Sequence, residues 1–444
     1  MTKIILKDID RAHENTKIGK SERKALTAKR FSSERRFRFL GGSAVLVAVA
    51  FLILLLWTII RNAIPAFTNH YAIVPLNFKN KELTAETLKT YDFRKMIRQG
   101  LKDLFPEVTT RKDKRLLQKI ISSGASISVQ KAAIRNTDWI GKTQDVSIPL
   151  SDKADLYFKE LLGNLSRPES ERKISDKEID WLKQLKGEGR IESRWNSIFF
   201  TNGASREPEM AGIWGAVVGS FLTLFVTLIL SFPVGVAGAI YLEEFSQKNR
   251  LNALIEVNIN NLAAVPSIVF GLLGLGIFIN GIDFGIITIG GGAPRSAALT
   301  GGMVLALMTL PTMIIASRTA IKSVPLSIRE AAFGIGASRI QTVFHHVLPL
   351  AMPGIMTGSI IGMARALGET APLLMIGMVA FIVDIPASFS DPATVLPVQI
   401  YMWADFPEIG FQQKTAAATL ILLVFLVLMN GVTVWLRNKF ERRW

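Results

Sequence analysis

Residues 329–349 read REAAFGIGASRIQTVFHHVLP, and the rest of the chain is arranged around this stretch. It is short and amphipathic and stands between two long apolar runs, so it must emerge from a membrane on one side. Glycine tolerates backbone angles that other residues avoid, so we expect a rigid helix that turns sharply at Gly336. The spacing E-A-A-x-x-x-G, with Leu-Pro following, comprises Glu330, Ala331, Ala332, Gly336, Leu348 and Pro349.

Two interpretations of this stretch stay open from the residues alone. A helix that transmits force would carry alanine where a partner's surface comes close, and a short helix in a groove is a recurrent mode of recognition. The plain alternative is a surface helix that only joins two membrane spans. His345 and His346 end the stretch, and they are either a proton switch or structural side chains at the membrane surface.

The composition limits the class of protein. Of 444 residues, 49% are hydrophobic and 20% are charged, which indicates apolar runs kept apart from polar segments. The chain contains no cysteine, which excludes a disulfide framework and a thiolate metal site, and four histidines make a histidine-rich metal site unexpected. We find no nucleophile–base pair or metal-ligand grouping, so no catalytic residue and no metal site is predicted.

The formal charge of +16 is concentrated near the start of the chain. Residues 1–39 hold twelve Lys or Arg against five Asp or Glu, directly before an uncharged run of membrane length at 40–60. Anionic lipid and membrane topology explain this excess better than nucleic acid does. The run is too long for a cleaved signal peptide, so we interpret it as a retained first span.

Five further spans are predicted after residue 210, at 211–242, 262–280, 297–317, 353–383 and 415–436. Pro233 and Pro372 are expected to kink their spans because each removes a backbone donor. Gly215 and Gly219 form a G-x-x-x-G pair that serves either close helix contact or ordinary packing.

Residues 61–209 have a different composition. They are rich in Lys, Glu, Asp and Ser and contain no run long enough to span a membrane. Residues 143–150 alternate like a strand, and 111–123 have helical spacing. We predict a small soluble insertion, α+β or mostly helical, with Trp139, Trp181 and Trp195 as core or interface anchors.

The short loops give an orientation. With the N-terminus in the cytoplasm, the cytoplasmic ends hold most of the Lys and Arg, and the opposite short loops contribute only Arg295 and Lys414. The loop 242–261 is the weak point, because its acidic residues outnumber its basic ones. This orientation places 61–209 outside the cell and 329–349 inside. The basic residues counted at the cytoplasmic ends are Arg318, Lys322, Arg329, Arg339, Arg437, Lys439, Arg442 and Arg443.

Three further stretches join the first one in a resemblance. Residues 232–245 read FPVGVAGAIYLEEF, 261–275 read NLAAVPSIVFGLLGL, and 365–373 read RALGETAPL. With the E-A-A stretch, these resemble the phosphate-transport permeases of the PstA type, membrane subunits of type I ABC importers. The resemblance covers about residue 210 to the C-terminus, and the GETAP segment favours PstA over its partner permease, PstC. The region between the first two spans resembles an extended variant.

The resemblance implies a fold, partners and a location. It implies an all-α polytopic membrane protein with six transmembrane helices and an external insertion. A PstC-type permease, a PstB-type ATPase dimer and an external phosphate-binding protein would be its partners, beside membrane lipid, in the bacterial inner membrane with both termini cytoplasmic. No cofactor is expected in this chain, because ATP and Mg would be bound by the partner ATPase. The implied organisation is a basic tail at 1–39, a first span at 40–60, the insertion at 61–209, a permease core at 210–436 with a coupling loop at 323–349, and a C-terminus at 437–444.

Arg365 and Glu369 stand four apart in an otherwise apolar run, so a helix would bring them within reach of each other. They form either a self-neutralising pair that locks helices or, with Thr370, part of a phosphate pathway.

The predicted function is therefore that of a permease subunit of an ATP-driven phosphate importer. A permease for another oxyanion, sulfate or molybdate, is the alternative within transport. A membrane sensor with an external ligand-binding domain is the alternative from another class.

Overall fold

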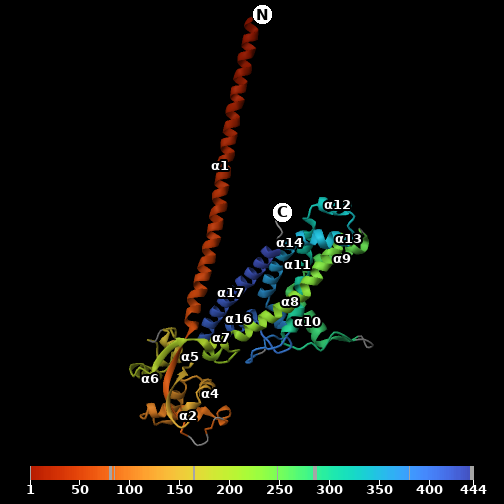
Figure 1. Cartoon of the computed structure of the whole chain (residues 1–444). Coiled ribbons are helices and arrows are strands. Elements are labelled where there is room, and N and C mark those ends of the chain that lie inside the picture. The colour runs from red at the N-terminus through yellow and green to blue at the C-terminus, as the bar shows by residue number, and fades with distance from the viewer. Residues whose placement is uncertain are drawn as a thin grey trace. The chain divides into compact units, whose positions relative to one another are not determined.

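A computed structural model describes residues 2–440 apart from 80–82, 85, 164–165, 248, 284–287 and 380. Lys248, Arg442 and Arg443, which the charge argument counts, lie outside these residues. Helix α1 (Thr2–Ala63) is one continuous helix that joins the basic tail to the first apolar run (Figure 1). It belongs almost entirely to a unit of its own, Met1–Arg61, and Asn62–Trp444 form the other unit.

Among the described residues, five helical segments are long and apolar enough to cross a membrane. A bent pair of helices could provide a sixth span. The predicted all-α polytopic fold is therefore confirmed, and the protein is a multi-pass membrane protein. The five segments are Ser33–Phe67, Trp214–Phe245, Ala298–Lys322, Arg339–Gly368 and Ile409–Lys439.

Two of the predicted spans are corrected by the structure. The run 262–280 is not one helix, because Arg250–Ala263 and Ser267–Asn280 meet at 101°. Pro266 lies in this break, and a proline disfavours helical backbone in the residue before it. The run 353–383 contains a helix only as far as Gly368, and Pro372 opens a separate five-residue helix, so it does not kink a span.

After the insertion, the helices follow one another in a simple order. They are α8 (Trp214–Ile240), α9 (Arg250–Ala263), α10 (Ser267–Gly274), α11 (Ala298–Lys322), α12 (Leu326–Gly334), α13 (Arg339–Gln341), α14 (Leu348–Gly368), α15 (Ala371–Met375), α16 (Leu396–Ala404) and α17 (Ile409–Phe440). Short strands β4 (Ile282–Asp283) and β5 (Thr288–Ile289) form a ribbon between α10 and α11. Pro233 lies inside α8, as the sequence predicts.

Glycines allow helices α8 and α11 to pack closely. A Cβ added to Gly302 of α11 would lie 2.5 Å from a Val226 carbon of α8, and one on Gly235 of α8 would lie 2.7 Å from Met313 of α11. These two helices therefore pack at backbone distance over much of their length. Gly219 has a different neighbour, the carbonyl oxygen of Thr394 in an irregular segment. The G-x-x-x-G pair is therefore not a helix–helix contact.

The insertion is α+β. Its sheet has the order β2-β1-β3, with β1 antiparallel to both neighbours. The predicted strand at 143–150 is present as β2, and helix α3 ends at Gln118, so only part of the predicted 111–123 helix forms. The elements are β1 (Thr68–Asn77), α2 (Phe93–Leu104), α3 (Arg111–Gln118), α4 (Ala125–Arg135), β2 (Thr143–Pro149), α5 (Asp152–Phe158), α6 (Asp176–Gly187), β3 (Ile191–Trp195) and α7 (Ser197–Thr201).

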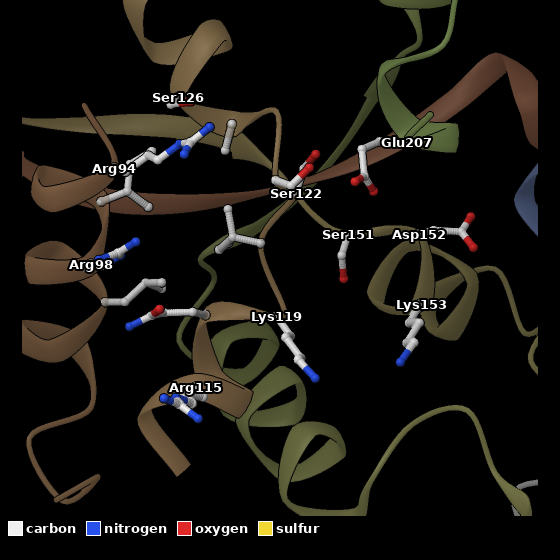
Figure 2. Close-up of a pocket in the computed structure, with 16 residues that line it drawn as sticks. Arg94, Arg98, Arg115, Lys119, Ser122, Ser126, Ser151, Asp152, Lys153 and Glu207 are labelled. Atoms are coloured by element: carbon white, nitrogen blue, oxygen red, sulfur yellow. The ribbon is translucent and has the colours of Figure 1, made fainter. Parts of the chain in front are cut away.

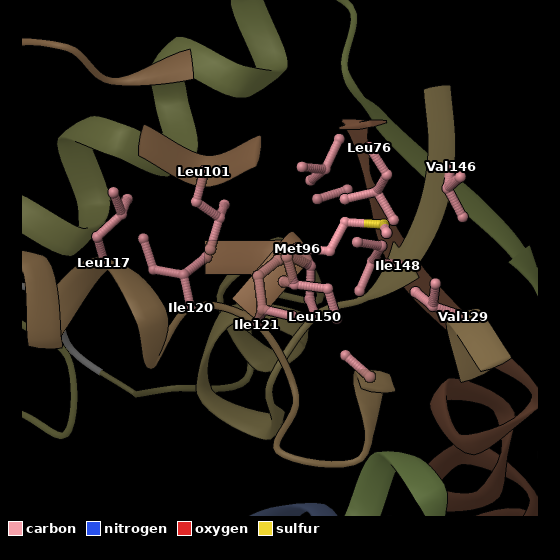
Figure 3. Packing of buried hydrophobic residues seen from close by; sticks show 14 of the residues in the cluster. Leu76, Met96, Leu101, Leu117, Ile120, Ile121, Val129, Val146, Ile148 and Leu150 are labelled. Atoms are coloured by element: carbon pink, nitrogen blue, oxygen red, sulfur yellow. The ribbon is translucent and has the colours of Figure 1, made fainter. Parts of the chain in front are cut away.

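Alternating residues of the strands and one face of each helix build the core of the insertion. Leu76 and Ile148 from the sheet and Met96 and Leu101 from α2 belong to one buried cluster, and Figure 3 shows Met96 on the side of the sheet residues and Leu101 on the side of Ile120. Trp181 is buried in this core and Trp139 packs at its edge. Trp195 is 62% exposed and stacks on Phe67 and Phe200, so it is a surface anchor.

The insertion meets the last helix, α17, at a buried polar junction. The Asp152 carboxylate of α5 accepts a hydrogen bond from the Gly410 amide, in the first turn of α17. The Lys414 ammonium is buried and donates to the Ala211 carbonyl at 2.5 Å. Burial raises the pKa of Asp152 to about 6 and that of Glu209 to about 7. The first turn of the last membrane helix is thus capped from another domain.

Candidate functional site

Helix α12 and the short helix α13 form a corner between the end of α11 and the start of α14 (Figure 1). Helix α12 ends in a Schellman motif, in which the Gly336 amide donates to the Phe333 carbonyl at 2.9 Å and the Ala337 amide donates to the Ala332 carbonyl at 3.0 Å. Gly336 has a φ of +86°, so the sharp turn predicted at this residue is present. Helix α13 then starts with a capping box between Ser338 and Gln341.

Five large apolar side chains of this corner are exposed. They are Leu326, Phe333, Ile335, Ile340 and Phe344, and Ile335 is 80% exposed; we call these five residues the apolar corner.

The motif residues divide between two sides. Glu330 and Ala331 are exposed, but Ala332 is buried against the chain itself. Of the two alanines expected to face a partner, only Ala331 is exposed. Leu348 and Pro349 are half-buried at the start of α14.

Arg329, the residue before the motif, attaches α12 to two membrane helices. Its guanidinium donates to the Val324 carbonyl at 2.7 Å and to the Ile321 carbonyl at 3.0 Å, both at the C-terminal end of α11. The same group is paired with the Glu244 carboxylate at 2.7 Å, just beyond α8. Both side chains are mostly buried. One side chain thus joins the ends of α8, α11 and α12.

A second arginine reinforces the same end of α11. The Arg318 guanidinium lies 2.5 Å from Glu243 and 2.9 Å from Glu256, so it connects α11 with the segment after α8 and with α9. Lys322 adds a contact to Glu243 at 3.3 Å. We call the residues Glu243, Glu244, Glu256, Arg318, Lys322 and Arg329 the charge cluster.

The sequence analysis missed this cluster. It treated the acidic residues of 242–261 only as the weak point of the orientation argument. Their partners stand 75 and 85 residues away in sequence, and no periodic pattern connects such positions. The one available signal was the acidic pair directly after an apolar run, because a carboxylate at a membrane boundary needs a nearby cation.

Arg365 and Glu369 are in contact, but not as neighbours on one helix. Arg365 Nε lies 3.6 Å from Glu369 Oε1. Helix α14 ends at Gly368, so Glu369 has extended backbone and Thr370 precedes α15. The Arg365 side chain is 54% exposed and that of Glu369 is 21% exposed. The pair therefore sits at a break in the helix and keeps one open side.

Two stretches that carried the resemblance meet beside this pair. A Cβ on Gly271 of α10 would lie 2.7 Å from the Cα of Pro372, so α10 and α15 touch backbone to backbone. Glycine is required at this position for steric reasons. Residues 261–275 and 365–373 therefore form one packed unit, as 232–245 and the E-A-A stretch do through the charge cluster.

His345 and His346 line an open cavity of about 630 Å³ between Pro325 and Leu350. The His345 ring Nδ1 lies 3.2 Å from the Gln341 carbonyl of its own helix. Over the residues that the structure describes, no group of three or more His, Asp or Glu side chains is arranged to hold a metal ion.

Two family models match this chain. The model of the binding-protein-dependent transport system inner membrane component matches residues 231–444, and a domain of unknown function matches 24–167. The phosphate transport system permease protein PstC of Pasteurella multocida is 32% identical over 246 residues, which cover 52% of this chain and 75% of the relative. The chain belongs to the binding-protein-dependent transport permeases.

Other relatives of this permease support the same family. PstA 1 of Mycobacterium tuberculosis is 28% identical over 54% of this chain and 75% of its own length. The probable ABC transporter permease YqgI of Bacillus subtilis is 35% identical over 40% of this chain and 56% of its own length. The resemblance to phosphate-transport permeases stated from the motifs is confirmed. Since PstA and PstC proteins both match, the preference for the PstA type rests on the GETAP segment.

The MetNI methionine transporter shares 18% identity over 52% of this chain and 95% of the matched chain, with a TM-score of 0.39. The sequence relatives alone identify this chain as a membrane subunit of an ABC importer.

Proposed function

We propose that this chain forms the phosphate pathway of an ATP-driven importer and is driven by a separate ATPase at the apolar corner. The observation that carries the coupling role is the Arg329 clamp, because it ties α12 directly to α8 and α11. The names of the PstA and PstC relatives support phosphate as the cargo. The partners would be a PstC-type permease, a PstB-type ATPase dimer that binds ATP and Mg, and an external phosphate-binding protein.

The proposed coupling works through rigid contacts. An ATPase that grips the apolar corner moves α12, whose two ends are fixed by the Schellman motif and by Arg329. Helices α8 and α11 follow, because Arg329 and Arg318 hold their ends and glycines hold them together along their length. Packed cores respond to such displacement by switching between arrangements rather than by bending. This is the basis for alternating access.

Arg365 is proposed to attract the phosphate anion, with Glu369 holding its guanidinium in place and Thr370 offering a hydroxyl. A carboxylate beside an anion pathway keeps binding weak, and a conduit must release what it binds. The open side of the pair faces out of this single chain, where the second permease would complete the pathway.

The proposed orientation puts the charge cluster and both termini in the cytoplasm. Helix α8 supports it, since its first residue follows the insertion and its last precedes Glu243. A helix of 27 residues rises about 40 Å, enough to cross a bilayer. The insertion and the apolar corner then lie on opposite sides of the membrane.

Purification from mild detergent tests the class of the proposal. Recovery of a second permease and an ATPase with the full chain is the expected result. The variant Ile335→Asp should lose the ATPase and keep the second permease, because it places a charge in the centre of the apolar corner. The matched control is Val257→Asp, an exposed apolar residue of α9 outside the corner. Equal loss of the ATPase in both variants would contradict the proposal that the apolar corner is the docking surface.

Uptake by whole cells tests the cargo. Labelled phosphate should accumulate, and unlabelled sulfate or molybdate in excess should leave its uptake unchanged. Competition by either oxyanion would point to the alternative cargo. A membrane-impermeant label at position 330 that reacts on intact cells would overturn the orientation.

A further inference from the structure

The insertion contains a cavity of about 750 Å³ that lies apart from the apolar corner and from Arg365. Figure 2 shows it between α2, α3, the first turn of α4 and the start of α5. Its floor includes Ile97, Leu101 and Ile121, which belong to or adjoin the core of the insertion. No role is assigned to it by the importer mechanism.

Five cationic side chains from three helices and their ends surround this cavity. Arg94 and Arg98 stand one turn apart on α2, so both project from the same face. Arg115 and Lys119 come from α3 and its end, and Lys153 comes from α5. All five are exposed, and in the described part of the chain none has a carboxylate within ion-pair distance.

Other cations of the same domain show that partners were available. Lys177 is paired with Asp113 at 2.8 Å, and Arg172 is paired with Asp176 at 2.5 Å. The cations around the cavity thus remain unpaired beside a domain that pairs others. Unpaired like charges held close together repel one another, and a bound anion would relieve that repulsion.

Two carboxylates also line the cavity, but they do not neutralise it. Asp152 is engaged by the Gly410 amide of α17, and in Figure 2 its carboxylate points away from the arginines. Glu207 lies at the rim beside Ser122 (Figure 2). Five cations against two carboxylates leave the site with a positive excess.

Neutral donors complete the lining. Ser123, Ser126 and Ser151 contribute hydroxyl groups, whereas the Ser122 hydroxyl is engaged with the Glu209 carboxyl. The Ser151 Oγ is buried and has no hydrogen-bond partner among the described residues. The first turn of α4 also faces the cavity, and the positive end of a helix favours an anion there.

We propose that this cavity binds a ligand that carries more than one phosphate group. Arginine forks match phosphate oxygens, and three hydroxyls with a helix end provide the remaining donors. The volume is in the range of sites for organic ligands and exceeds what one orthophosphate needs. A soluble condensed phosphate and the headgroup of a multiply charged anionic phospholipid share this chemistry.

Binding to the purified full chain distinguishes these sources. In detergent, calorimetric titration with pyrophosphate and tripolyphosphate tests the soluble ligand, with sulfate as the control anion. Native mass spectrometry after exchange into cardiolipin or phosphatidylcholine tests the lipid. We expect pyrophosphate or cardiolipin to be retained and sulfate and phosphatidylcholine not to be.

A pair of matched variants tests the site itself. Arg94→Gln with Arg98→Gln should weaken binding of the retained probe at least tenfold. Lys131→Gln with Lys183→Gln removes the same charge from exposed positions of α4 and α6 that do not line the cavity, and should change it less than twofold. Arg98→Gln alone serves if the double variant does not fold. Equal weakening by both pairs, or no retention of any probe, would overturn the proposal, and neither result depends on phosphate uptake.

Discussion

Replacement of Gly336 by alanine perturbs the coupling corner at one backbone position. Gly336 has a φ of +86°, where a residue with a Cβ is strained, and its amide makes one of the two bonds that end α12. No atom lies within 4 Å of an added Cβ, so steric contact with neighbours contributes nothing. The whole effect therefore comes from backbone strain.

The left-handed conformation costs a residue with a Cβ about 1–2 kcal/mol. Such a cost corresponds to about a 5- to 30-fold decrease in the population of the intact corner when the corner is marginally stable. Asparagine tolerates this conformation better than alanine, so Gly336→Asn should fall between alanine and glycine.

Gly334→Ala is the matched control, two residues away in α12. An added Cβ there also meets nothing within 4 Å, and its φ is not positive. Alanine favours helix over glycine by up to about 1 kcal/mol, so this variant should be neutral or slightly stabilised.

The measurements are the rate of phosphate uptake and the amount of ATPase retained on purification. Both should fall for Gly336→Ala, fall less for Gly336→Asn, and stay unchanged for Gly334→Ala. Equal effects of the two alanine variants would refute the argument that the turn at Gly336 shapes the docking surface.

Three other changes test separate parts of the structure. Burial raises the pKa of Glu209 from 4.5 to about 7. Between pH 4.5 and pH 7 the folded state therefore binds more protons than the unfolded state, and the free energy of unfolding falls as the pH rises through this range. Glu209→Gln should therefore gain up to about 3 kcal/mol at pH 8.5 and little at pH 4.5, as measured by thermal melting in detergent. Gly219→Ala drives a methyl group into the Thr394 carbonyl and should cost about 1–3 kcal/mol in the same melting assay. Glu369→Gln should insert normally but lower phosphate uptake about fivefold, because Arg365 loses its charged partner.

A specific result would contradict each of these three predictions. A melting temperature difference between wild type and Glu209→Gln that does not vary with pH would remove the buried carboxyl as a source of pH dependence. Gly215→Ala is the control for Gly219, since its Cβ would lie 3.5 Å from the nearest atom, an ordinary contact. Similar losses for both glycines would show that the close approach is not responsible. Unchanged uptake by Glu369→Gln would defeat the pathway role.

The sequence predicted what depends on local composition. Apolar length predicted six spans, and the described residues contain five helices of sufficient length and one bent pair. Alternation predicted strand β2. The turn at Gly336 followed from the properties of glycine alone. Hydropathy also predicted a single span over 262–280, because the average over an apolar run does not register the bend at Pro266.

The remaining features depend on contacts between distant residues. Helix α14 ends at Gly368, although the apolar run continues beyond it. Glu244 pairs with Arg329, and Arg94 and Lys153 line the same cavity, although the residues of each pair come from different elements. No local period encodes such contacts, so these parts of the candidate sites became visible only in the folded chain.

The contact of Asp152 with Gly410 has a consequence for biogenesis. During synthesis, Asp152 emerges long before Gly410, and its carboxylate must wait for an amide that belongs to the final helix. The domain that carries Asp152 therefore completes its packing only after the whole polypeptide has been threaded into the bilayer. A stalled or truncated product that lacks Gly410 leaves this carboxylate without its amide donor and open to water.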